Sequence, residues 1–146
     1  MRGQTRAGRP YWGQNQRMNL SPLGVRATAG SLRAADGVVL HHTWTAEGVV
    51  AGRAVNGAHL LHLSVALCVL NDTYREAERL GLEVDGVAVE ADGRFDEEWR
   101  STGIEYTVTL DSRAGAEDLA RLVAVVEEVA EIPRALRTGA PVSRRA

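Results

Sequence analysis

The sequence predicts an α+β fold in which antiparallel strands flank a long, mostly buried central helix. Nearly every residue from Leu60 to Leu70 is apolar, so a helix in this stretch needs cover on most of its sides. Short runs of alternating apolar and polar residues, bounded by turn residues, lie before and after it. A second helical repeat of apolar residues occupies residues 116–131. At 146 residues, the chain is long enough for one domain.

The N-terminal part of the chain is expected to be rich in strands. Residues 1–22 abound in Gly, Arg, Gln and Asn and predict a flexible arm, which leaves 23–146 as a single domain. Turn-forming residues separate the three β-prone runs that follow, so we expect them to form a meander. These three runs are Val25–Ser31, Val38–Thr45 and Gly48–Val55.

The central helix should end near Gly81. Charged residues interrupt the apolar run from Asn71 onward, and glycine favours the left-handed conformation that stops a helix. Two further strands are predicted at Leu82–Glu90 and Gly103–Leu110, joined by a polar hairpin connection.

The second helix is predicted at Ala116–Glu131. It should stop at Pro133, because the residue before a proline avoids helical geometry. The remaining tail could add a short strand near Val142.

Composition excludes several classes of function. The net charge is −2 and no basic run is present, which argues against nucleic acid as a partner. No apolar run is long enough to cross a bilayer and no signal-peptide core is visible, so a cytoplasmic protein without a membrane partner is expected. The single cysteine rules out an internal disulfide and fits a reducing compartment. Glycine-rich phosphate loops are absent, so no nucleotide cofactor is predicted.

One stretch of the chain resembles a known family. Asn56-Gly57-Ala58-His59-Leu60, followed by small and apolar residues up to Cys68, resembles the central helix of the OsmC/Ohr family. In that family an Asn-Pro-Glu-x-Leu start leads without gaps to a peroxidatic cysteine. The resemblance implies N-terminal strands, this helix, two more strands, a second helix and an interlocked homodimer. A homodimer is also expected because a small chain has difficulty covering so apolar a helix by itself.

The resemblance implies a thiol peroxidase site of four parts, of which two are missing. An arginine holds the reactive cysteine as a thiolate, a glutamate orients the arginine, and a second cysteine resolves the sulfenic acid. Cys68 matches the reactive position, and Arg26 is the nearest arginine, with Arg33 second. Ala58 stands where the glutamate would be, and Ile132 stands where the resolving cysteine would be.

Asp72 should weaken any remaining redox activity. It lies four residues after Cys68 on the same helix face, where a negative charge raises the pKa of a thiol. Cys68 is therefore either a nucleophile or a small buried apolar residue.

Histidines are the other candidates for chemistry. His41 and His42 are expected on a strand, so only one of them can face a pocket, where it could act as a general acid or base. His59 and His62 share a helix face. With one strand histidine they could ligate a metal, but no thiolate completes that set, so no metal site is predicted.

Three functions remain open. The preferred one is a homodimer whose degenerate peroxidase site binds or transforms a small, mostly apolar organic molecule by non-redox chemistry. The alternatives are a one-cysteine organic hydroperoxide reductase that uses an external thiol, and a ligand-binding dimer without catalysis. The residues assigned to this site are Cys68, Arg26, His41, His42 and Asp72 for chemistry, with Ala58, His62 and Ile132 for binding.

Overall fold

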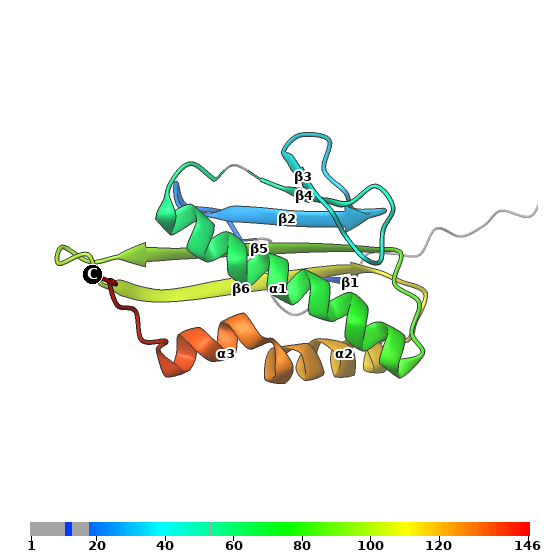
Figure 1. Cartoon of the computed structure of the whole chain (residues 1–146). Coiled ribbons are helices and arrows are strands. Elements are labelled where there is room, and N and C mark those ends of the chain that lie inside the picture. Colours follow the sequence, from blue (N-terminus) through cyan, green and yellow to red (C-terminus); the bar gives the residue numbers. More distant parts are fainter. Residues whose placement is uncertain (1–10, 13–17, 53) are drawn as a thin grey trace, which may run out of the picture.

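The computed structural model describes residues 11–12, 18–52 and 54–146 (Figure 1). Short N-terminal strands are followed by one long helix, a long hairpin and two C-terminal helices. In order they are β1 (Tyr11–Trp12), β2 (Val25–Gly30), β3 (Val38–Leu40), β4 (Val49–Ala51), α1 (Gly57–Leu80), β5 (Gly86–Phe95), β6 (Ser101–Asp111), α2 (Ala116–Val129) and α3 (Glu131–Thr138).

The strands form one six-stranded sheet in the order β1-β6-β5-β2-β4-β3, with every neighbouring pair antiparallel. Helix α1 crosses one face of this sheet and contacts β2, β5 and β6, while α2 and α3 pack beside α1 (Figure 1). The predicted α+β class, with antiparallel strands around a long central helix, is confirmed.

The predicted meander of the first three strands is wrong, because β4 lies between β2 and β3. Burial explains the order. All three residues of β4 are about 2% exposed, so this strand needs a neighbour on each side, whereas Val38 and Val39 of β3 are 63% and 57% exposed at the sheet edge. Both strands are also shorter than their patterns predicted.

Helix α1 begins and ends where side-chain chemistry favours it. The Asn56 side chain accepts a hydrogen bond from the His59 backbone N–H at 2.9 Å, which caps the N-terminus. Gly81 closes the other end with φ of 68°, which confirms the predicted glycine stop. One stripe of the helix stays uncovered within the chain. Leu60 is 58% exposed, and Ser64, Leu67 and Asn71 are half-buried.

The core lies between α1 and the sheet. Alternate residues of the central strands face the helix, and many are small, which lets α1 approach the sheet closely. The strand residues are Val25, Ala27, Ala29, Val87, Val89 and Ala91, and they share one buried cluster with Leu63, Val69 and Leu70 of α1.

Strand β5 starts later and runs further than predicted. It begins at Gly86 and extends to Phe95, and β6 runs from Ser101 to Asp111, with an irregular register near Gly93. Most of the expected polar connection therefore belongs to the strands.

The C-terminal region corrects two expectations. Helix α2 ends at Val129, and Pro133 lies inside the first turn of α3. Proline is tolerated there because backbone N–H groups in a first turn need no partner within the helix. Residues 139–146 form no strand, and Val142 is 95% exposed.

The expected flexible arm falls mostly outside the described residues. Among the described residues of this arm, β1 pairs with β6, and the Ser21 hydroxyl donates a hydrogen bond to Asp92 Oδ1 at 2.6 Å. Within the described part of the chain, no helix combines the length and apolarity needed to span a bilayer.

Candidate functional site

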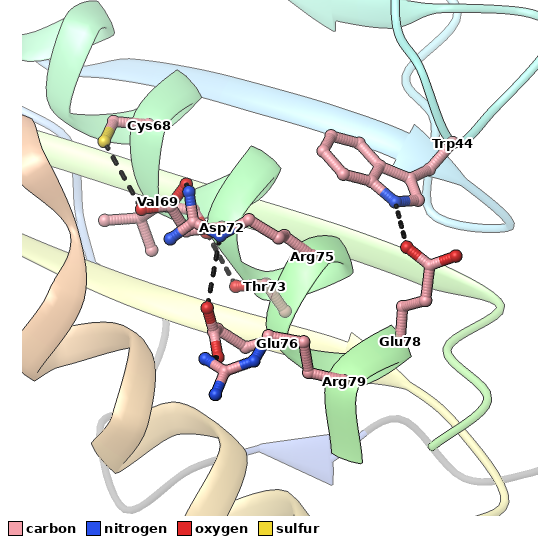
Figure 2. Close-up of polar contacts among 9 residues, drawn as sticks. All are labelled: Trp44, Cys68, Val69, Asp72, Thr73, Arg75, Glu76, Glu78 and Arg79. Atoms are coloured by element: carbon pink, nitrogen blue, oxygen red, sulfur yellow. Dashed lines mark hydrogen bonds and ion pairs between the residues drawn. The ribbon is translucent and has the colours of Figure 1, made fainter. Parts of the chain in front are cut away.

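Cys68 lies on α1 where the start of α3 packs against it. Its side chain is 8% exposed, and its thiol points to Asp72 Oδ2 at 3.9 Å (Figure 2). The pKa of Cys68 is raised to about 11, mainly by burial; the carboxylates of Asp72 and Glu131 also raise it, while the backbone N–H groups of Ile132 and Glu131 lower it. At neutral pH the residue is a thiol.

Asp72 is the buried carboxyl group beside this thiol. It is 3% exposed, and Arg75 Nη1 lies 3.0 Å from its Oδ1. Burial raises the pKa of Asp72 to about 6; Arg75 opposes this shift, and Glu131 and Glu76 add to it. Asp72 can therefore exchange a proton near neutral pH, which few carboxyl groups can do.

A charged network on α1 holds Arg75 in place. Glu76 is 3% exposed and accepts from Arg75 Nε at 3.1 Å and from Arg79 Nη1 at 2.7 Å (Figure 2). Because Arg75 contacts both Glu76 and Asp72, the second carboxyl oxygen of Asp72 stays directed at Cys68.

Asp72→Asn is expected to flatten the pH dependence of stability. The folded pKa of about 6 exceeds the ordinary value of 3.8, so the folded state keeps a proton that the unfolded chain releases between these values. The free energy of unfolding of the wild type should therefore fall as pH rises from about 4 to about 6, by on the order of 1–2 kcal/mol.

Urea unfolding at several pH values measures this effect. Asp36→Asn is the matched control, because Asp36 is exposed on a loop and should leave the profile unchanged. Parallel profiles for the wild type and Asp72→Asn would contradict the assignment.

Arg26 does not lie beside Cys68 within the chain. Its neighbours Val25 and Ala27 face α1, so Arg26 projects from the opposite face of the sheet, where its Nε donates to Glu90 Oε1 at 2.9 Å. The pair joins register partners on β2 and β5. Arg33 is exposed on the following loop.

None of the four histidines is among the groups that act on Cys68, and none belongs to a metal-ligating group of the described residues. His41 and His42 lie in the loop after β3 rather than on a strand; His41 is exposed, and His42 is buried with its Nδ1 2.7 Å from Thr45 Oγ1. His59 Nε2 lies 2.7 Å from the carbonyl oxygen of Pro22. His62 is fully buried, with Nδ1 2.8 Å from the Leu23 carbonyl oxygen. Both helix histidines thus tie α1 to the chain entering β2.

The two substituted family positions have different placements. Ile132 contributes a backbone N–H that acts on the Cys68 thiol, so this position does lie at the cysteine. Ala58 is ten residues before Cys68, which is about 15 Å along the helix axis, so the structure does not bring them together in one chain.

Sequence reasoning missed Glu131, Arg75 and Tyr106. Tyr106 lies on β6, and burial raises its pKa, with smaller effects from Glu127, Arg137 and Cys68. The available signal for Glu131 was its position directly before Ile132, which stands at a site position of the family resemblance.

Metal-ligating side chains gather at one place in the described part of the chain. Ligand atoms of Cys68, Asp72 and Glu131 lie within 4.8 Å of one another. The histidines do not join them, and Asp72 Oδ1 already pairs with Arg75. We refer below to Cys68, Asp72, Glu131 and Ile132 as the Cys68 cluster.

Comparison with known proteins identifies the family. The family model described as OsmC-like protein matches residues 50–144, from β4 into the tail. No curated protein matches the chain. A crystal structure of an OsmC-like hydroperoxide resistance protein from Jannaschia sp. CCS1 is 15% identical; the alignment covers 85% of this chain and 93% of that one, with a TM-score of 0.49. Because the family model covers more than half of the sequence and includes the Cys68 cluster, this chain belongs to the OsmC-like protein family.

Proposed function

We propose that the protein is a cytoplasmic homodimer in which the Cys68 cluster binds and transforms a small, mostly apolar organic molecule by acid–base chemistry rather than by peroxide reduction. The observation that carries the proposal is the charge around the thiol. Both charged side chains that act on Cys68 are carboxylates, Asp72 and Glu131, and both disfavour a thiolate.

A thiol peroxidase needs the opposite environment. The attacking species is the thiolate, which a nearby cation favours. Here the arginine expected from the first strands, Arg26, is bonded to Glu90 on the far face of the sheet. The resolving position is occupied by Ile132, so an oxidised Cys68 would also lack a partner thiol in its own chain.

Asp72 is the residue best placed to move a proton in this chemistry. Its pKa of about 6 means that both protonation states are populated near neutral pH. Arg75 fixes one of its oxygens and leaves the other toward Cys68. The Ile132 side chain packs against the apolar core cluster that includes Cys68, and a mostly apolar surrounding of this kind suits a substrate with one polar group on a mostly apolar body.

The exposed stripe of α1 supports a dimer. Leu60 is 58% exposed on the same helix as Cys68, and the half-buried residues Ser64 and Leu67 continue the stripe toward it. A second copy placed on this stripe would cover apolar surface that the chain leaves open and would lie next to the Cys68 cluster.

The test is turnover of an aryl alkyl hydroperoxide with excess dithiothreitol, with Cys68→Ser as the matched variant. We expect both proteins to consume hydroperoxide at the background rate, and we expect a small apolar ligand that raises the melting temperature of the wild type to lose this effect in Asp72→Asn. Robust hydroperoxide reduction that disappears in Cys68→Ser would overturn the proposal.

One observation favours the second candidate, a one-cysteine hydroperoxide reductase. The backbone N–H groups of Glu131 and Ile132, at the start of α3, act on the sulfur and lower its pKa. Such groups could stabilise negative charge on an oxidised sulfur. Because burial and two carboxylates outweigh them, we rank this function second.

A further inference from the structure

The tip of the β5–β6 hairpin holds a tryptophan in a costly backbone conformation. Trp99 has φ of 64°, and it is the one non-glycine residue with positive φ in the described part of the chain. A side chain in this region costs roughly 1 kcal/mol, which glycine would avoid. Trp99 is also 84% exposed, so the cost is not offset by burial. The exposed indole of Trp99 is therefore the feature that this loop offers to a partner.

The loop beneath Trp99 is built to hold this conformation. Asp96 accepts hydrogen bonds from the backbone N–H groups of Glu98 at 3.0 Å and Arg100 at 2.9 Å, and its carboxylate also pairs with the Arg100 side chain at 2.9 Å. The Trp99 N–H donates to the Asp96 carbonyl oxygen at 3.0 Å. A preorganised loop presents its side chain at a low entropy cost on binding.

The charge of the tip defines the chemistry of its partner. Residues Asp96 to Arg100 carry three carboxylates and one guanidinium, so their net charge is about −2 (−3 + 1). Glu97 is exposed and has no ion pair among the described residues. An acidic tip with an exposed indole suits a cationic partner, above all arginine, whose guanidinium stacks on tryptophan and pairs with carboxylates. It does not suit an anionic membrane or a nucleic acid.

The chain carries such a partner in its own C-terminal tail, residues 139–146. The tail includes Arg144 and Arg145 next to Val142, which is 95% exposed. Residues 140–146 make no hydrogen bond or ion pair with any described residue, and the same holds for the ion pairing of Glu97 at the tip. Both features are drawn at the same end of the molecule in Figure 1.

We propose that the Trp99 tip of one chain docks on the arginine tail of a second copy, with Trp99 stacked on Arg144 or Arg145 and Glu97 paired with the other. The two features lie on every chain, so a symmetric pair makes the contact twice. This contact does not involve the Cys68 cluster and does not rest on the function proposed above.

Fluorine NMR of the full-length chain labelled with 5-fluorotryptophan tests the contact. Its three tryptophan resonances are assigned by single replacement with phenylalanine. The labelled chain carries Arg144→Glu and Arg145→Glu, so its own tail cannot bind its tip. On mixing with unlabelled wild type, we expect the Trp99 resonance to move with increasing concentration, and the unlabelled double variant should bind roughly tenfold or more weakly.

The matched control is unlabelled Arg113→Glu/Arg121→Glu, which makes the same charge change at two exposed sites away from the tail and should move the resonance as the wild type does. Three results would overturn the proposal. The Trp99 resonance could keep its chemical shift when unlabelled wild type is added. It could also move by the same amount with the unlabelled tail variant as with the wild type. It could also be shifted in labelled wild type at a concentration at which the chain is monomeric, which would show that the tail binds its own tip.

Discussion

Cys68 is expected to react with iodoacetamide about 100-fold more slowly at pH 7 than a cysteine of ordinary pKa. Only the thiolate is nucleophilic, and a pKa of about 11 against the ordinary 9.0 lowers the thiolate fraction by about two powers of ten. Burial is the main cause, because the side chain is only 8% exposed. The measurement is the alkylation rate by mass spectrometry between pH 6 and pH 10.

The same chain in concentrated urea is the internal control, since unfolding removes burial and both neighbouring carboxylates and should restore an ordinary rate. Asp72→Asn should increase the native rate only modestly, because burial remains. Fast native alkylation with a midpoint below about pH 8 would remove the physical basis for a non-redox site and favour the hydroperoxide reductase.

Gly30→Ala is expected to destabilise the fold by roughly 2–5 kcal/mol, the sum of a left-handed backbone penalty and an overpacked contact. Gly30 ends β2 with φ of 64°, and a Cβ atom there would press against the carbonyl oxygen of Asp85 and lie 2.9 Å from the Tyr74 hydroxyl oxygen. The Asp85 carbonyl cannot yield freely, because it accepts the Ser31 N–H at 2.8 Å. Chemical denaturation measures the loss.

Gly57→Ala is the matched control for this change. Gly57 is the first residue of α1, and a Cβ atom there would meet nothing within 4 Å. Alanine also favours a helix, so this variant should be as stable as the wild type or slightly more stable. Equal stability of the two variants would contradict the close approach of Gly30 to Asp85.

Much of the fold could be predicted because its signals are local. The apolar run from Leu60 and the Gly81 stop are both local features of α1. The order of β3 and β4 could not be predicted, because it depends on which strand is buried on both sides, and the two have similar composition. Pro133 was expected to end the second helix, but it lies in the first turn of α3, where proline is tolerated.

The candidate site was predictable only in part. Cys68, Asp72 and Ile132 do lie together, and the first two follow from helical spacing. Arg26 could have been placed from the sequence, since it occupies the polar phase of an alternating strand, as Glu90 does in its partner. Glu131 reaches the cluster only because the chain turns between α2 and α3, and no local pattern encodes that turn.

The position of β2 in the middle of the sheet has a consequence for how the chain folds. The β3–β4 and β5–β6 hairpins each close over short connections, but β2 joins them by pairing with β4 on one side and with β5, beyond the whole of α1, on the other. Each hairpin needs only a short loop closure to form. We expect the rate of folding to be limited by the one long loop closure, the docking of β5 on β2 around the central helix.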